Sequence, residues 1–300
     1  MKATFPPSVI ALGKFDGIHK GHQELIKKVI ENKDDSLVSA VFTFDKTILN
    51  FTEEGLLPLL NEDERIVIFN ELGIEYIACY SFDDSLKNLS RESFVEEILI
   101  KRLNAKKVVI GEDFRFGKGR EGDVSWLNSV KDSYNLELIV VPDLADDDGR
   151  ISSSRIRDCL IKADIKAANK MLGRPYSISG RIIHGRELGR TIGIPTTNVK
   201  MPKEQFVPAL GVYITKSTID AKEYYGISNL GFKPTVNGKH LLCETNLFNF
   251  YDDVYDRDMK VEFLEYIRPE KKFSSVMELQ EEMKRNILYA KSYVREHFNK

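Results

Sequence analysis

Cysteine is scarce in this chain, and its spacing excludes two classes of small protein. The three cysteines, Cys79, Cys159 and Cys243, are far apart in the sequence. A disulfide framework or a structural zinc site needs closely spaced pairs, so we expect neither. Free thiols are typical of a reducing compartment, and we therefore expect a cytoplasmic protein.

Long apolar runs are missing as well. No stretch of about 18 consecutive apolar residues occurs, and the N-terminus, Met1-Lys2-Ala3-Thr4, lacks the apolar stretch of a signal peptide. We therefore expect a soluble, unexported protein with no membrane partner.

A concentrated basic surface is also absent from the sequence. The isoelectric point is about 6.3, and residues 1–160 hold 21 lysines and arginines against 29 aspartates and glutamates. A nucleic-acid partner is therefore not expected, and the partners should be small-molecule substrates. The sequence leaves self-association open.

The length predicts two domains. Three hundred residues with 42% hydrophobic content can form two cores of ordinary size. Residues 1–160 alternate β-branched runs with amphipathic stretches, which predicts an α/β domain with a parallel, Rossmann-like sheet. We expect its strands at 9–12, 37–44, 76–82, 107–110 and 136–141, and its helices at 23–31, 62–72, 91–103 and 124–134.

Residues 161–300 show a different pattern of predicted secondary structure. One or two connecting helices are expected over 152–172, before Gly173-Arg174-Pro175 breaks the pattern. The segments at 176–183, 211–217, 223–230, 241–248 and 259–266 are strand-like and have no helices between them. One long amphipathic helix is expected at 275–297. This series predicts a mainly antiparallel β-barrel with a C-terminal helix.

The first strand runs directly into a glycine- and histidine-rich loop. Residues 13–22 read G-K-F-D-G-I-H-K-G-H, and a helical pattern follows. Glycines let a backbone approach phosphate, a helix N-terminus carries partial positive charge, and the imidazoles of His19 and His22 can donate hydrogen bonds. An ordinary turn with surface histidines is the alternative for this motif taken alone.

Two further polar loops follow strands of the same predicted sheet. Residues 111–117 read G-E-D-F-R-F-G, and residues 150–157 read R-I-S-S-S-R-I-R. Ligands of open parallel sheets bind at the carboxyl ends of the strands. Helix capping alone would explain the serines, but three such loops in this order favour a ligand site.

These three motifs resemble the FMN adenylyltransferase domain of prokaryotic bifunctional riboflavin kinase/FAD synthetases. The resemblance implies that ATP lies over the H-x-G-H loop and that the FMN phosphate attacks its α-phosphate, giving FAD and pyrophosphate. It implies a catalytic role for His19 and His22, which would stabilise phosphate charge. The implied ATP-binding residues are Gly13, Phe15, Gly21, Asp113, Arg150, Ser153 and Arg157.

A second glycine-punctuated loop lies in the other half. Residues 185–198 read G-R-E-L-G-R-T-I-G-I-P-T-T-N, which suits a phosphate cradle. The Thr196 hydroxyl and the Asn198 carbonyl are hard oxygen ligands suited to magnesium. Downstream, Glu244 supplies a carboxylate that could accept a substrate proton. A plain connecting loop and a solvated glutamate are the alternatives.

This half resembles the riboflavin kinase family. The resemblance is carried by G-R-T-I-G-I-P-T-T-N, by N-L-G-F-K-P-T at 229–235 and by I-R-P-E-K-K-F at 267–273. It implies that Thr196 and Asn198 bind Mg²⁺ and ATP, and that Glu244 deprotonates the ribityl 5′-hydroxyl of riboflavin for attack on the γ-phosphate of ATP. The implied residues at the ATP and flavin are Gly185, Gly189, Gly193 and Pro195.

Two positions in this half depart from the family pattern. Asn246 replaces a frequent histidine, and Asp256 follows Tyr255 where glycine is usual. We expect Asp256 to imitate a glycine turn at some cost. The alternatives are a diverged paralogue with FMN adenylyltransferase activity only, or a flavin- or nucleotide-binding regulator on the same scaffold.

Overall fold

The computed structural model describes residues 5–45, 56–183, 194–235, 238–250, 252 and 254–298. The contacts divide the chain into two compact units, Met1–Ser153 and Ser154–Lys300. The boundary expected from the sequence, between residues 160 and 161, falls inside helix α7 (Ser153–Ile161). Within the described residues, no helix is long and apolar enough to cross a membrane.

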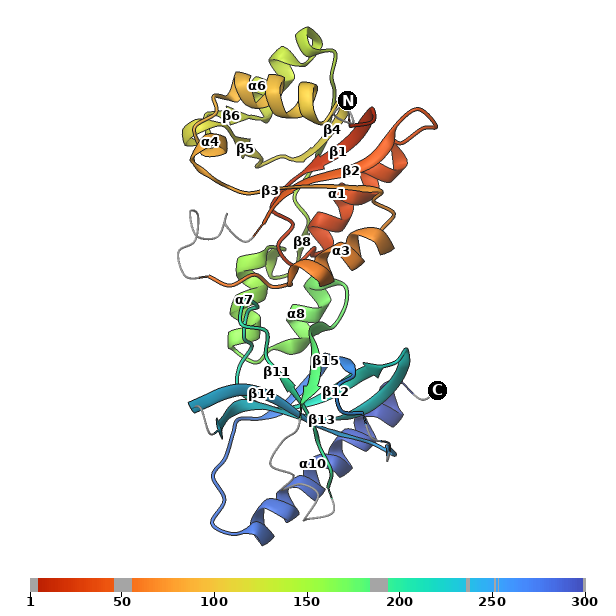
Figure 1. Cartoon of the computed structure of the whole chain (residues 1–300), viewed down its shortest axis with the longest axis vertical. Coiled ribbons are helices and arrows are strands. Elements are labelled where there is room, and N and C mark those ends of the chain that lie inside the picture. The colour runs from red at the N-terminus through yellow and green to blue at the C-terminus, as the bar shows by residue number, and fades with distance from the viewer. Residues whose placement is uncertain are drawn as a thin grey trace. The chain divides into compact units, whose positions relative to one another are not determined.

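The first unit is built on a five-stranded sheet (Figure 1). The strand order is β3-β2-β1-β4-β7, and every pairing is parallel. The predicted parallel sheet is therefore confirmed. Its strands are β1 (Ser8–Leu12), β2 (Val38–Phe44), β3 (Tyr76–Tyr80), β4 (Ala105–Gly111) and β7 (Glu137–Val141). Its α-helices are α1 (Lys20–Glu31), α3 (Glu62–Glu71), α4 (Asp84–Lys87), α5 (Arg91–Ser93) and α6 (Val124–Val130).

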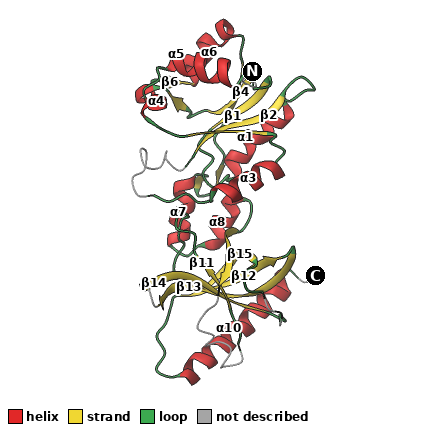
Figure 2. Ribbon diagram, viewed as in Figure 1, coloured by secondary structure: helices red, strands yellow, loops and turns green. Residues whose placement is uncertain are grey.

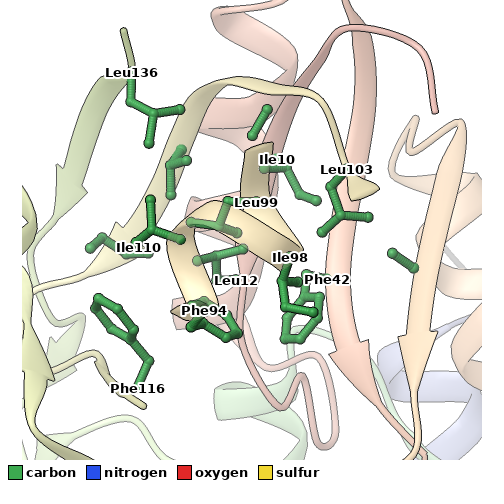
Figure 3. Packing of buried hydrophobic residues seen from close by; sticks show 14 of the residues in the cluster. Ile10, Leu12, Phe42, Phe94, Ile98, Leu99, Leu103, Ile110, Phe116 and Leu136 are labelled. Carbon is green, nitrogen blue, oxygen red and sulfur yellow. The ribbon is translucent and has the colours of Figure 1, made fainter. Parts of the chain in front are cut away.

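Alternation along the strands supplies a core on each face of the sheet. On β1, Ile10 and Leu12 belong to one apolar cluster, whereas Val9 and Ala11 belong to the other. Successive strand side chains point to opposite faces, so a strand buried on both sides needs apolar residues throughout. Figure 3 shows the first cluster, in which Ile10 and Leu12 lie among side chains from several elements.

One predicted helix is wound differently from expectation. The segment expected to be an ordinary helix at 91–103 is a short α5 followed by a π-helix, η1 (Phe94–Arg102). The amide of Leu103 bonds to the carbonyl of Ile98, five residues back. π-Helices are rare and are frequent at functional sites.

Short elements connect the main strands of the first unit. Two small hairpins pair β5 (Arg115–Phe116) with β6 (Gly122–Asp123), and β8 (Ala145–Asp146) with β9 (Gly149–Arg150). The 3₁₀ turns are η2 (Lys118–Arg120) and η3 (Lys131–Tyr134). The sequence patterns did not predict these elements, because two-residue strands have no measurable periodicity.

The second unit begins with α7 and α8 (Ile165–Leu172) and continues as a closed barrel. Its strand order is β10-β11-β14-β13-β12-β15, with antiparallel pairing throughout, so the predicted barrel is confirmed. The strands are β10 (Tyr176–Ile183), β11 (Thr197–Lys200), β12 (Gly211–Ile219), β13 (Lys222–Thr235), β14 (Gly238–Leu247) and β15 (Asp258–Arg268). Strand β11 corrects the expectation that Thr197 and Asn198 merely end a loop.

The barrel interior contains a chain of hydrogen-bonded hydroxyl groups, and the barrel's outer surface carries an apolar patch. Inside, the hydroxyl oxygens of Thr215, Ser228 and Thr245 form a buried chain with 2.7 Å between neighbours. Outside, Ile214 and Ile227 pack against α10 (Val276–His297), which runs beside the strands in Figure 2. The predicted C-terminal helix is thus present and closes one side of the barrel.

Asp256 occupies the turn that was expected to suit glycine. Its φ is 63°, in the left-handed region that side chains rarely adopt. Its amide donates to the carbonyl of Ile182 at 3.1 Å, which ties the turn to β10. Aspartate tolerates this region better than most residues, so the turn keeps its form without glycine.

Candidate active sites

The loop between β1 and α1 is held in a strained backbone conformation. Phe15 and Ile18 have φ values of 51° and 40°. Such values are uncommon for residues other than glycine, and this kind of strain concentrates at functional sites. The hydroxyl of Thr43 donates to the carbonyl of Lys14 at 2.9 Å and so fixes the loop to β2.

Two histidines stack at the start of α1. The ring centroids of His19 and His22 are 3.8 Å apart, with 19° between the ring planes. His19 is buried, and the fully buried ring of Phe15 lies 5.2 Å from the ring of His22. A Cβ atom on Gly21 would lie 3.2 Å from the His19 ring, so glycine leaves room for it. With the partial positive charge of the helix N-terminus, the pair suits a phosphate group.

Both histidines line a cavity of about 370 Å³ in the first unit. The cavity brings together most residues predicted for adenylyl transfer. These are Gly13, His19, Gly21, His22, Asp113, Arg150 and Ser153. Phe15 does not line the cavity, because its ring is packed in the core behind His22.

Arg150 is held at the cavity by two carboxylates. Its Nη2 lies 2.5 Å from Oδ2 of Asp113, and its Nε lies 3.0 Å from Oδ2 of Asp143. Burial raises the pKa of Asp143, and the charge of Arg150 opposes this rise. The amide of Asp143 donates to Oε1 of Glu112 at 3.1 Å. Asp143 was not predicted from the sequence, and it orients a residue that was.

The serine and arginine predicted to bind the triphosphate belong to different units. The hydroxyl of Ser153 donates to the carbonyl of Asp16 at 2.7 Å, and the amide of Leu59 donates to Oδ1 of Asp16 at 2.8 Å. Ser153 therefore contacts the loop that carries the histidines. Arg157 lies in the second unit, where its buried guanidinium is 5.6 Å from the ring centroid of Phe206.

Part of the same cavity is lined by aromatic rings. Neighbouring rings contact one another at centroid distances of 5.1 to 5.6 Å. We call this set the aromatic wall: Phe42, Phe44, Phe82, Phe94, Phe114 and Phe116. Flat aromatic ligands stack favourably on such surfaces. A single cavity thus combines a loop suited to phosphate with a surface suited to a planar ring system.

In the second unit, three polar residues lie opposite one another on adjacent strands. Asn198 of β11 pairs with Glu244 of β14, which pairs with Asn229 of β13. Directly opposed residues point to the same face of a sheet. Their sequence neighbours Thr245 and Ser228 point into the barrel. We call Asn198, Glu244 and Asn229 the outer row, because they face outward.

Both amides of the outer row carry an unsatisfied oxygen. In the part of the chain that the structure describes, Oδ1 of Asn198 and Oδ1 of Asn229 are buried and accept no hydrogen bond. Buried acceptors without donors are uncommon, and at functional sites a ligand commonly satisfies them. The two oxygens belong to the residues on either side of Glu244, so this face of the sheet is a candidate ligand site.

Asn246 fixes the start of β11 next to this row. Its Nδ2 donates to the carbonyl of Pro195 at 2.8 Å. The departure from the usual histidine therefore has a defined structural role. Thr196 follows Pro195 and lies two residues before Asn198. The predicted residues Gly185, Gly189 and Gly193 lie outside the described residues.

Comparisons with known proteins identify the family of each half of the chain. Residues 1–155 match the family model described as FAD synthetase, and residues 172–294 match the one described as riboflavin kinase. The chain belongs to the bifunctional riboflavin kinase/FMN adenylyltransferase family. The Buchnera aphidicola (Schizaphis graminum) enzyme of this name is 37% identical over 294 residues, which are 95% of this chain and 94% of that one. The Bacillus subtilis enzyme is 36% identical over 288 residues, 93% of this chain and 90% of that one.

A solved structure shares the whole fold. The crystal structure described as a macrolide-efflux protein from Streptococcus pneumoniae has a TM-score of 0.86 and 33% identity. The match covers 99% of this chain and 96% of that one. Family membership confirms the predictions of an enzyme, of FAD and FMN biosynthesis, and of an α/β domain followed by a kinase-type barrel.

The oxygen atoms of Asn198, Glu244 and Thr196 fit the magnesium ion that this family's kinase reaction implies. The Asn198 carbonyl is a hard oxygen, it is buried, and it accepts no hydrogen bond in the described part of the chain. Mg²⁺ prefers such oxygens together with carboxylates and phosphates. Thr196 and Glu244 supply a hydroxyl and a carboxylate nearby in the chain and in the sheet.

Sequence reasoning missed three features of these sites: Asp143, the aromatic wall and Asn229. Asp143 gave no signal, because a lone acidic residue after a strand is common. The aromatic wall left a partial signal, since Phe42 and Phe44, like Phe114 and Phe116, are two residues apart and share a face at a strand end. Asn229 stood in the N-L-G-F-K-P-T motif without an assigned role.

Proposed function

We propose that the first unit transfers AMP from ATP to FMN in the 370 Å³ cavity. The observation that carries this proposal is that the stacked pair His19–His22 and the aromatic wall line one cavity. The wall stacks on the flavin ring system, and the loop and helix N-terminus hold phosphates. The two groups that must react are thereby held in one place.

The transfer is a displacement at phosphorus. A phosphate oxygen of FMN forms a bond to the α-phosphorus of ATP, and the bond to the pyrophosphate oxygen breaks. The protein supplies positioning and charge stabilisation. His19 and His22 donate hydrogen bonds to the phosphate oxygens as negative charge builds up. Arg150, oriented by Asp113 and Asp143, binds the triphosphate together with Ser153.

The barrel phosphorylates riboflavin at the outer row. Glu244 accepts the proton of the ribityl 5′-hydroxyl, whose oxygen bonds to the γ-phosphorus of ATP while the bond to the ADP oxygen breaks. Thr196 and Asn198 hold Mg²⁺, which neutralises phosphate charge when bound. The backbone of Pro195, tied to Asn246, orients these two residues.

The proposal also covers the small-molecule partners, the metal and the compartment of the enzyme. Its partners are ATP, riboflavin and FMN, with Mg²⁺ as the metal, and its compartment is the cytoplasm. The three cysteines support a reducing compartment because they are free, and burial raises the pKa of each thiol.

Chromatography of reaction products tests the proposal. The purified chain is incubated with ATP and Mg²⁺, once with riboflavin and once with FMN. We expect FMN and FAD from riboflavin, and FAD with pyrophosphate from FMN. FAD from FMN alone would overturn the kinase assignment, and FMN without FAD would overturn the adenylyltransferase assignment. Tight flavin binding without any product would support a binding protein.

A further inference from the structure

The N-L-G segment at 229–231 has no role in the reactions described so far. It lies in the middle of β13, the strand beside Glu244. Asn229 is opposite Glu244 in the register, so its side chain emerges next to the carboxylate on the same face. Asn229 can therefore contact the same ligand as Glu244, the proposed base.

The state of the Asn229 amide indicates a missing partner. Its Oδ1 is buried, and within the described residues it accepts no hydrogen bond. An acceptor removed from water without a donor costs free energy, which is regained when a ligand supplies the donor. Asn198 shows the same feature on the other side of Glu244. The proposed Mg²⁺ ion accounts for the unsatisfied oxygen of Asn198.

Strand spacing keeps the two amides apart unless both side chains lean toward Glu244. Adjacent strands lie about 4.8 Å apart, so Asn198 and Asn229, separated by β14, have Cα atoms roughly 9.6 Å apart. Two oxygens on one Mg²⁺ lie at most about 4.2 Å apart. Glu244 stands between the two amides, and side chains on the convex outer face of a barrel diverge. A ligand other than Mg²⁺ is therefore the simpler partner for Asn229.

A polyhydroxylated chain provides that ligand. Gly231 follows Asn229 on the same face, and a Cβ there would lie 2.0 Å from Oε1 of Glu270. The Glu270 carboxylate thus lies over this part of β13. Glu244 and Asn229 carry acceptor oxygens side by side on this face, and the Glu270 carboxylate lies over the neighbouring Gly231. Hydroxyl groups are the donors that match such a row.

We propose that Asn229 binds a second hydroxyl of the acceptor alcohol, beside the hydroxyl that Glu244 deprotonates. The inference rests on the proposed kinase function and adds a residue that selects the substrate. Asn198 and Asn229 then bind different ligands: Asn198 faces the metal and nucleotide, and Asn229 faces the ribityl chain. The hydroxyl of the alcohol donates to Oδ1 of Asn229 and satisfies it.

The test compares Asn229→Ala with Asn198→Ala in the full chain. For Asn229→Ala we expect the KM for riboflavin to rise by up to about tenfold, the worth of one hydrogen bond, while the KM for MgATP stays unchanged. For Asn198→Ala we expect the reverse: a changed dependence on Mg²⁺ and ATP. An unchanged denaturant midpoint shows that the barrel of each variant is folded, and FAD formation from FMN, a reaction of the first unit, should be equal in both.

Riboflavin analogues that each lack one ribityl hydroxyl sharpen the test. The unmodified enzyme should penalise one analogue by up to about tenfold in KM, and Asn229→Ala should abolish that penalty. A raised KM for MgATP in Asn229→Ala, or an analogue penalty that persists, would overturn the inference while leaving the kinase function intact. If the unmodified chain made no FMN from riboflavin, the proposed function itself would fail, and this inference with it.

Discussion

The two sites of this enzyme are assembled in different ways. In the first unit, the residues proposed to bind phosphate stand on segments that follow β1, β4 and β7, and they surround a cavity. In the second unit, the outer row stands on three neighbouring strands and depends on their register. The first site is therefore shaped by loop conformation, and the second by strand pairing.

This difference indicates where each site is vulnerable. The loop before α1 keeps Phe15 at a φ of 51° and depends on contacts such as that of Thr43 with Lys14. The outer row has no strained residue, but a one-residue slip of β14 would turn Glu244 into the barrel. Single substitutions at each site test whether the two sites can be damaged separately.

The largest expected effect is that of Glu244→Gln. Glutamine keeps the shape of the side chain but cannot accept the proton, so riboflavin phosphorylation should fall by about 10² to 10⁴-fold. FAD formation from FMN should be unchanged. Initial rates of FMN and FAD formation, followed by chromatography, check this. Equal loss of both activities would contradict the separation of the sites.

His22→Ala should have the complementary effect. Loss of one donor to the transition-state phosphate should slow FAD formation by about 10² to 10³-fold. Riboflavin phosphorylation should keep its rate, because Glu244 and the outer row lie in the other unit. His240→Ala, a histidine of β14 outside both proposed sites, is the control and should leave FAD formation unchanged. The hypothesis fails if His22→Ala retains normal FAD formation.

Two glycines of β13 test the register of the second site. A Cβ on Gly226 would lie 2.3 Å from the backbone oxygen of Asn246, whereas on Gly231 its three nearest atoms would belong to the Glu270 carboxylate. Gly226→Ala should therefore cost about 2 to 4 kcal/mol of unfolding free energy, and Gly231→Ala much less, because a surface side chain can move away. Denaturant unfolding measures both. Equal costs would show that the strand pairing is not as described.

The smallest effect concerns Asp143→Asn in the first site. An exposed ion pair contributes little, so the KM for ATP should rise by about 2- to 5-fold at neutral pH. Burial raises the pKa of Asp143, so the wild-type carboxylate loses its charge, and Arg150 its partner, as the pH falls through a value above the ordinary range. The wild type and the variant should therefore converge at acidic pH. The control is Asp147→Asn, which makes the same charge change on a neighbouring residue that does not line the cavity.

Much of the architecture could be predicted because its signals are periodic. The five parallel strands and the barrel strands β10 and β12 to β15 carry apolar or alternating patterns that are several residues long. Strand β11 was missed because it has four residues and follows a glycine-rich loop. The π-helical winding of η1 could not be predicted, since hydrophobic periodicity does not distinguish it over nine residues.

The sites show the same division between local and long-range signals. His19 and His22 could be assigned from a contiguous motif, because one helix start brings them together. Asp143 and Asn229 could not, because their partners Arg150 and Glu244 are brought to them by a hairpin and by strand register. A sequence shows a residue of this kind only once the pairing is known.

Mixing two single-site variants tests the central claim most directly. Glu244→Gln and His22→Ala are each supplied with riboflavin, ATP and Mg²⁺, separately and then together. We predict that neither variant alone makes FAD at an appreciable rate, and that the mixture does, because His22→Ala releases FMN that Glu244→Gln converts to FAD. A mixture that makes no more FAD than the separate variants would contradict the account of two sites with separate chemistry.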